Sequence, residues 1–415
     1  MSNFKHRELR EIAQFNPSEK LAINTVAKKI PMGNLKEYQR KIKGYEVAEY
    51  KSGPKFRNGD VLLAKITPCL ENGKTAFVDI LDKEEVAFGS TEFIVLRAKE
   101  NSDEEYLYYL ARSPAFRKKA ISCMEGTSGR KRVNEGALKL QELPIPDRST
   151  QQKIAAVLSA LDAKIDCNNR INAELEAMAK TLYDYWFVQF DFPDANGKPY
   201  KSSGGKMVYN ATLKREIPAG WKDGTLDDLG RIVGGSTPST ENPSNFTTNG
   251  TPWITPYDLS GNQGNKFITR GAQDVSDEGI KNASLKKAPA GTVLLSSRAP
   301  IGYMAIARVE LTTNQGFKSF IPTNEFSTAF IYYTVKGSLK TITQYASGST
   351  FKEVSAAVLK TIKTTLPDAN LVDQFTVTVS SIFKRQNLLE QENQQLAQLR
   401  DWLLPMLMNG QVTVA

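Results

Sequence analysis

The chain repeats itself, because motifs of its N-terminal half return in the same order in its C-terminal half. The segment 133–154 is matched by the segment 354–375. Gly-Asp-Val-Leu-Leu at 59–63 returns as Gly-Thr-Val-Leu-Leu at 291–295, slightly further along the chain than the first match would place it. The second copy therefore carries a net insertion or deletion. A unit of about 200 residues far exceeds the period of roughly 20–50 residues found in solenoids. We therefore expect one domain and one connector, each made twice.

Charge and composition favour an anionic partner. The 415 residues include 54 Lys and Arg against 45 Asp and Glu, a net charge of +9. Such an excess favours nucleic acid or acidic lipid. No run reaches the roughly 18 apolar residues that span a bilayer, and the first residues do not form a signal peptide. We expect a cytoplasmic protein with no membrane partner, whose cysteines Cys69, Cys123 and Cys167 show no metal-ligand spacing.

The sequence lacks the motifs of common catalytic sites. His6 is the only histidine, and it lies at a terminus that we expect to be frayed, which argues against a Ser-His-Asp triad or a histidine-rich metal site. Gly-Lys-Thr at 73–75 is no phosphate-binding loop, because Pro68 stands where the first glycine belongs. An amino-methyltransferase motif would require a Pro-Pro pair, and the chain has none. Asp194 and Lys198 alone provide too few carboxylates to hold the Mg²⁺ of a nuclease site. The sequence therefore predicts a binding protein with no catalytic residue, metal or cofactor of its own.

Two long helices are predicted, one after each domain. Apolar residues follow a 3-4 spacing from 151 to about 185, and the repeat reproduces it near the C-terminus. Thr376–Val379 is β-branched and locally favours a strand, but the repeat favours helix. Pro405 predicts a kink or an end near the last turn. The residues expected to pair the helices are Ile154, Leu158, Leu161, Ile165, Asn172, Leu175, Leu182, Phe375, Val379, Ile382, Leu389, Asn393, Leu396 and Leu403.

A helix of about 38 residues is about 57 Å long. It is too long for one small domain to bury the whole row of apolar residues, which we call the seam. We expect the two helices to pair as an antiparallel coiled coil, related by a pseudo-two-fold internal repeat. The matched Asn172 and Asn393 would fix the register of this pair, unless both are solvated on a loosely packed helix. The predicted fold is mixed α+β, with two α/β domains at 1–147 and 221–367, helices at 148–190 and 368–415, and a linker at 191–220.

Each domain is expected to carry a polar loop suited to DNA. Strands are predicted at 59–63, 93–96, 291–295 and 317–321, and helices at 104–111 and 328–335. The loop Gly-Thr-Ser-Gly-Arg-Lys-Arg at 126–132 offers amides, hydroxyls and cations, which suit phosphates and guanine edges. The alternative is a solvated basic loop. The candidate DNA-binding residues are Lys65, Thr127, Ser128, Arg130, Lys131 and Arg132 in the first domain, and Arg298, Ser349, Thr350 and Lys352 in the second.

Several short motifs, in the same order in both halves, resemble those of a known family. They include Gly-Ser-Thr-Pro-Ser at 235–239, Pro-Trp-Ile-Thr-Pro-Tyr-Asp-Leu at 252–259, Thr-Asn-Gln-Gly-Phe at 313–317, and Leu-Pro-Ile-Pro at 143–146 leading to Gln-Gln-Lys-Ile at 151–154. Nearly the whole chain resembles the specificity subunit of a type I restriction-modification enzyme. Two slots depart from the pattern: 372–375 reads Val-Asp-Gln-Phe, and 30–35 replaces the tryptophan motif of the second half.

The resemblance implies that each domain is a target recognition domain for one part of a bipartite, asymmetric site in double-stranded DNA. The helices would set the spacer and dock two methyltransferase subunits, which carry S-adenosylmethionine and methylate adenine N6. Up to two restriction subunits, using ATP and Mg²⁺, would join for cleavage. Three other interpretations remain open. They are a DNA-binding regulator without methyltransferase partners, a coiled-coil scaffold joining two protein-binding domains, and a nuclease or methyltransferase with a novel motif.

Overall fold

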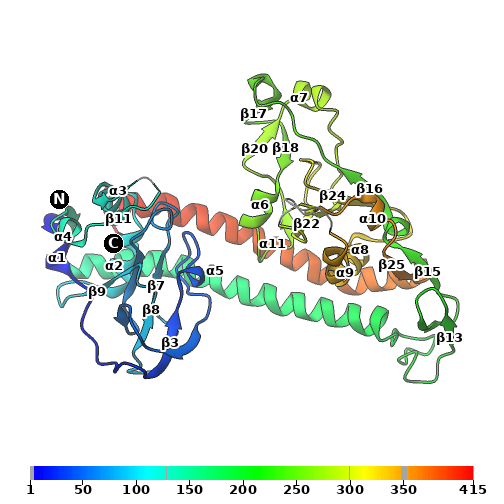
Figure 1. Ribbon diagram of the computed structural model, residues 1–415, viewed down its shortest axis with the longest axis horizontal. Helices are drawn as coiled ribbons and strands as arrows, with labels where there is room; N and C mark the ends of the chain where they lie inside the picture. The colour runs from blue at the N-terminus through cyan, green and yellow to red at the C-terminus, as the bar shows by residue number, and fades with distance from the viewer. Residues whose placement is uncertain (1–3, 128, 299, 347–352, 415) are drawn as a thin grey trace. The chain divides into compact units, whose positions relative to one another are not determined.

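A computed structural model describes residues 4–127, 129–298, 300–346 and 353–414 (Figure 1). The chain divides into two units by its internal contacts. Unit 1 comprises residues 1–167 and 392–415, and unit 2 comprises residues 168–391. The sequence predicted each long helix as a separate segment. In the structure, each unit instead contains part of both long helices.

Apart from its parts of the two long helices, unit 1 consists of short strands and short helices. Its strands are β1 (Lys5–Glu8), β2 (Ala13–Phe15), β3 (Val26–Ile30), β4 (Glu46–Glu49), β5 (Lys55–Phe56), β6 (Val61–Ala64), β7 (Thr75–Phe77), β8 (Ala87–Gly89), β9 (Phe93–Ala98), β10 (Met124–Glu125), β11 (Arg132–Val133) and β12 (Glu142–Ile145). Its short helices are α1 (Leu9–Ile12), η1 (Met32–Asn34), α2 (Glu104–Arg112), α3 (Pro114–Ser122) and α4 (Glu135–Lys139).

Unit 2 has a comparable set of elements. Its strands are β13 (Met207–Asn210), β14 (Arg215–Pro218), β15 (Lys222–Thr225), β16 (Gly230–Gly234), β17 (Phe246–Thr247), β18 (Thr251–Ile254), β19 (Phe267–Ile268), β20 (Gln273–Val275), β21 (Val293–Leu295), β22 (Met304–Ala307), β23 (Thr312–Thr313), β24 (Lys318–Pro322) and β25 (Lys363–Leu366). Its short helices are η3 (Leu226–Leu229), η4 (Pro243–Asn245), α6 (Pro256–Gly261), α7 (Asp277–Asn282), α8 (Thr328–Gly337), α9 (Leu339–Gln344) and α10 (Ala356–Leu359).

The sheets of the two units follow the same plan. Unit 1 orders one sheet β2-β9-β6-β7, and unit 2 orders its counterpart β16-β24-β21-β22-β19. A second sheet in each unit contains one parallel pair, β3 with β8 and β18 with β23. In these pairs Ile30 lies opposite Gly89, and Ile254 lies opposite Thr313. The same difference in residue number therefore relates β3 to β18 and β8 to β23. The slot 30–35 therefore folds like the tryptophan motif that it replaces.

The predicted strands and short helices are confirmed, and burial explains them. Every residue of β6 and of β21 is buried, as expected for apolar runs covered on both faces. The helix α2 begins after Asp103, whose carboxylate accepts a hydrogen bond from the amide of Tyr106. The helix α8 begins in the same way after Ser327. Such caps satisfy amides that have no partner within the helix.

The two long helices are α5 (Arg148–Tyr183), which continues into the π-helical turn η2 (Asp184–Val188), and α11 (Ala369–Met408). Thr376–Val379 is helical, so the prediction from the repeat is confirmed against local propensity. Pro405 lies inside the last turn of α11, which ends at Met408. Asn172 is buried and Asn393 is half-buried, so Asn172 is not the solvated residue that the alternative required.

The helices run antiparallel within each unit. In unit 1, Arg400 Nη1 donates to Asp162 Oδ1 at 2.5 Å, and Lys164 Nζ lies 3.4 Å from Glu392 Oε1. In unit 2, Gln386 Nε2 donates to the carbonyl of Asn172 at 3.2 Å. The ring of Phe375 lies further back along α11 and contacts Tyr183, Trp186 and Phe187, at the far end of α5.

Helix ends complete the core of each unit. The largest core cluster of unit 1 includes Ile154 and Leu158 from α5 together with Leu404 and Leu407 from α11. The core of unit 2 includes Phe375 and Val379 from α11, with Tyr183 and Trp186 from α5 and η2. These two sets occupy matching positions in the repeat of the helix sequence. Each domain is thus closed by the start of one long helix and the end of the other.

Candidate nucleic-acid interface

The candidate residues of unit 1 gather around the hairpin of β10 and β11. We call residues 126–132, which are the connection and the first residue of β11, the basic loop. The amide of Thr67 donates to the carbonyl of Lys131 at 3.0 Å. The amide of Val133 donates to the carbonyl of Lys65 at 2.8 Å. The structure thus brings Lys65, at the end of β6, beside the basic loop, although the two are far apart in sequence.

The basic loop presents exposed cations on a tight backbone. Gly126 and Gly129 have φ values of +121° and +81°, in the left-handed region that favours glycine. A Cβ on Gly126 would lie 3.0 Å from the carbonyl oxygen of Arg130. Thr127, Arg130 and Lys131 are exposed. Among the residues that the structure describes, the side chains of Arg130 and Lys131 have no hydrogen-bond or ion-pair partner, so both cations are accessible to an anionic ligand.

Arg132, at the base of the loop, is already paired. Its Nη2 lies 2.8 Å from Glu92 Oε1, and its Nε lies 2.9 Å from Glu92 Oε2, a two-point contact. This hydrogen bonding, followed by the charges of Arg132 and Lys65, lowers the pKa of Glu92 below its usual value. The ion pair fixes the guanidinium of Arg132 in one orientation and offsets its charge. Arg132 therefore stabilises the basic loop, in addition to being a candidate DNA contact.

Unit 2 has the same backbone bridge, but a different ion pair lies beside it. Ile66 bridges to Arg132 in unit 1, and their counterparts in the repeat, Arg298 and Glu353, bridge in unit 2. Arg298 Nε donates to Glu353 Oε2 at 2.9 Å. The arginine has therefore moved to the opposite strand of the bridge. The candidates Ser128, Ser349, Thr350 and Lys352 lie outside the described residues.

The residues predicted to pair the helices all lie on covered faces. Ile154, Leu158, Asn172, Phe375, Val379, Ile382 and Leu389 are buried, and Leu161, Ile165, Leu175, Leu182, Asn393, Leu396 and Leu403 are half-buried. Several of them pack into the domain cores as well as against the other helix. The seam residues therefore serve both to pair the two helices and to attach the helices to the domains.

One buried charged cluster in unit 2 escaped the sequence interpretation. Lys266 Nζ lies 2.6 Å from Glu176 Oε2 and donates to Gln386 Oε1 at 2.7 Å. Glu390 accepts the amide of Lys266 at 2.7 Å and Arg308 Nη2 at 2.7 Å. Burial lowers the pKa of Lys266 to about 8, against the opposing charge of Glu176. Gln386 lies between Ile382 and Leu389, where the 3-4 spacing of the helix calls for an apolar residue. This polar residue was a signal in the sequence, but it did not indicate a partner.

The described ranges show no metal or membrane site. Within them, no three His, Cys, Asp or Glu side chains gather closely enough to hold a metal ion. In the same ranges no helix is both long and apolar enough to cross a bilayer.

Comparison with known proteins decides the family. A model described as the type I restriction modification DNA specificity domain matches the chain twice, over residues 1–177 and 218–398. The chain belongs to this family. The resemblance seen in the sequence motifs and the predicted internal repeat are thus confirmed, since the same domain model fits both halves.

Relatives in the family span the whole chain. The HindI specificity subunit of Haemophilus influenzae is 28% identical over 99% of this chain and 100% of its own length. The MjaIX specificity subunit of Methanocaldococcus jannaschii is 39% identical over 43% of this chain and 41% of its own. A solved S subunit from M. genitalium has 15% identity and a TM-score of 0.57, covering 98% of this chain and 96% of that one, which supports the fold alone.

Proposed function

We propose that the chain directs a type I restriction-modification complex to a bipartite, asymmetric DNA sequence, with one domain reading each half-site. The observation that carries this proposal is that the two units repeat one sheet order and one backbone bridge, while the amino-acid sequences next to the two bridges differ. A shared frame with different surface residues suits two readers of different sequences. Arg130 and Lys131 are the proposed phosphate contacts of unit 1, and Lys65 and Arg298 flank the two loops.

The long helices are proposed to act as the spacer between the readers. The antiparallel contacts within each unit support an antiparallel coiled coil with a pseudo-two-fold relation between the repeats. The matched sets of core residues, including Tyr183 in one unit and Leu404 in the other, support the same relation. Half-sites about one turn of B-DNA apart, roughly 34 Å, would present the same face of the duplex.

Catalysis is proposed to reside on partner subunits. Two methyltransferase subunits would bring S-adenosylmethionine and methylate N6 of one adenine in each half-site, after flipping it out of the stack. Up to two restriction subunits would bring ATP and Mg²⁺. This chain would supply recognition and docking in the cytoplasm and no catalytic group.

The test is to map N6-methyladenine in the source cell with the gene intact, deleted, or lacking residues 165–168. Loss of one bipartite motif on deletion is expected. Removing four helical residues shortens the helix by about 6 Å, so the internal deletion is expected to change the spacer by about one or two base pairs. The matched control replaces the same four residues with alanine and keeps the spacer. An unchanged motif in the deletant would contradict the role of the helices, and an unchanged methylome without the gene would favour the regulator or scaffold.

A further inference from the structure

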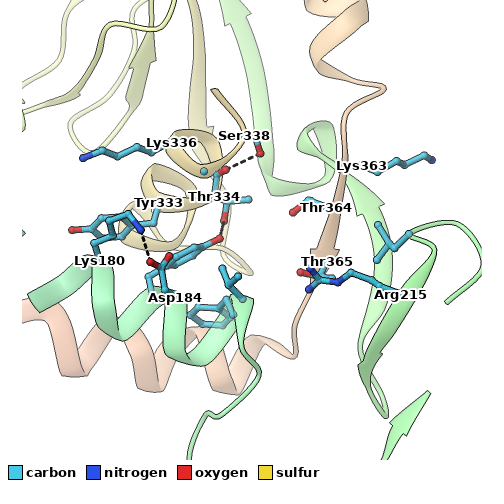
Figure 2. A pocket seen from close by; sticks show the side chains of 15 residues that line it. Lys180, Asp184, Arg215, Tyr333, Thr334, Lys336, Ser338, Lys363, Thr364 and Thr365 are labelled. Carbon is cyan, nitrogen blue, oxygen red and sulfur yellow. Dashed lines mark hydrogen bonds and ion pairs between the residues drawn. The ribbon is translucent and has the colours of Figure 1, made fainter. Parts of the chain in front are cut away.

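Unit 2 contains a pocket of about 280 Å³ that the proposed function does not use (Figure 2). It is lined by the end of α5 with η2, by β14, by the end of α8, and by β25. Its charged lining residues are Lys180, Arg215, Lys336 and Lys363 against the single carboxylate of Asp184. The pocket therefore carries an excess of positive charge.

Arg215 is the cation best placed to receive a ligand. Lys180 pairs with Asp184, and Lys336 Nζ lies 2.7 Å from Glu176 Oε1. Figure 2 shows the side chains of Lys336 and Lys363 extending away from the middle of the view. The Arg215 guanidinium instead lies 4.6 Å over the ring of Phe190. Among the described residues, no carboxylate pairs with it.

Arg215 is an exposed residue, but the protein atoms around its guanidinium remove part of the hydration and so lower its pKa. An arginine that has lost part of its hydration and has no counter-ion favours an anion that can accept its fork of N–H groups. Thr364 and Thr365 of β25 are half-buried lining residues, and Figure 2 shows Thr365 beside Arg215. Because successive side chains of a strand point to opposite faces, we assign the hydroxyl of Thr365 to the site. Buried Phe187 supplies an apolar wall. The pocket thus joins an anion-binding side to an apolar side.

The internal repeat shows how two charged positions at this pocket differ from their counterparts in unit 1. In unit 1, buried Arg112 donates through Nη2 to Asp401 Oδ1 at 2.7 Å. The alignment that matches β8 with β23 continues to place Lys336 at the position of Arg112. The alignment of the long helices places Lys180 at the position of Asp401. An ion pair in unit 1 is therefore replaced by two cations in unit 2, which removes a carboxylate from the site.

We propose that this pocket binds a phosphate ester, with Arg215 and the hydroxyl of Thr365 holding the phosphate. The volume exceeds by several times the roughly 30 Å³ that one water occupies, and it lies near the lower limit of about 300 Å³ for small-molecule sites. It accommodates more than a bare phosphate group. The wall at Phe187 would receive the rest of the molecule, which favours a free nucleotide over a backbone phosphate of DNA.

The test is calorimetric titration of the intact chain with AMP, ATP and inorganic phosphate at low ionic strength. We expect a nucleotide to bind at one site and inorganic phosphate to bind more weakly. Arg215→Gln is expected to weaken nucleotide binding about 10- to 100-fold, as for a lost charged hydrogen bond. Thr365→Val, which preserves the size of the side chain, is expected to weaken it by a smaller factor. Circular dichroism checks that both variants fold.

The matched control is Arg231→Gln, which removes the same charge from an exposed arginine of β16 that does not line the pocket. It should leave nucleotide affinity unchanged. A parallel titration uses a short random-sequence duplex. If Arg215→Gln weakens duplex binding and no nucleotide binds, the phosphate comes from the DNA backbone. The proposal is overturned if neither ligand binds at millimolar concentration, or if Arg215→Gln binds both as tightly as the native chain.

Discussion

The buried ion pair between Asp162 and Arg400 should be a principal attachment of the two helices within unit 1. Their side chains are 6% and 8% exposed, and the carboxylate also accepts the hydroxyl of Tyr109 at 2.7 Å. Replacing Asp162 with alanine leaves the guanidinium buried beside Asp401 alone, at 2.9 Å. Breaking a buried pair costs about 3–5 kcal/mol. The remaining contact with Asp401 places this variant at the lower end of that range.

The loss of the hydroxyl's acceptor adds a second contribution. A buried donor left unsatisfied costs about 1–3 kcal/mol, so we expect Asp162→Ala to lower the free energy of unfolding of unit 1 by about 4 kcal/mol in all. Asp162→Asn retains an acceptor for Tyr109 and should cost about 1 kcal/mol less. The difference between the two variants separates the hydroxyl from the ion pair.

The assay is urea unfolding, monitored by the hydrogen exchange of peptides from residues 148–167. Peptides of unit 2 serve as the internal control. The double variant Asp162→Ala with Arg400→Ala completes a thermodynamic cycle. A coupling energy of about 2–3 kcal/mol is expected for residues in direct contact. The reasoning would be refuted if Asp162→Ala cost less than about 1 kcal/mol, or if the two substitutions were additive.

Three further predictions follow from burial and charge. Because burial lowers the pKa of Lys266 to about 8 while the unfolded chain keeps the proton to about 10.4, stability should rise between these pH values. The free energy of unfolding should rise by about 1 kcal/mol per pH unit in this range. Urea unfolding at several pH values should show this rise in the native chain and its loss in Lys266→Met. Phe375→Ala removes a fully buried ring and should cost about 3–5 kcal/mol by urea unfolding, whereas exposed Val377→Ala should cost under about 0.5 kcal/mol. Arg130→Ala with Lys131→Ala should weaken DNA binding and lower the salt slope by about two; an unchanged slope in fluorescence anisotropy would exclude the loop as a phosphate contact.

The repeat made most of the fold predictable, because burial imposes the same apolar pattern on both copies. It even overruled local propensity at Thr376–Val379, where packing of Phe375 and Val379 into the core of unit 2 outweighs the β-branched preference for strand. The seam of each helix was likewise visible as apolar spacing. What the spacing could not show is that the same residues also close the cores of the domains.

The electrostatic partners were not predictable, because they depend on tertiary contacts. Arg132 reads in the sequence as one more cation of a basic loop, and only the fold places Glu92 against it. Lys266 stands in a polar stretch that suggests exposure, yet it is buried against Glu176. Arg215 lies in a predicted linker, where nothing in the sequence indicated a pocket.

The division of the two units along the chain sets the order in which a newly made molecule can fold. Unit 2 is a single stretch, residues 168–391, and has all its parts once its last residue has been synthesised. Unit 1 is begun first but takes Leu404, Leu407 and Met408 into its core. Its N-terminal stretch must therefore wait, with part of its apolar surface uncovered, until the last turns of α11 leave the ribosome. The N-terminal domain is thus the last part of the molecule to be completed, and a nascent chain released early would carry a finished C-terminal domain and an incomplete N-terminal one.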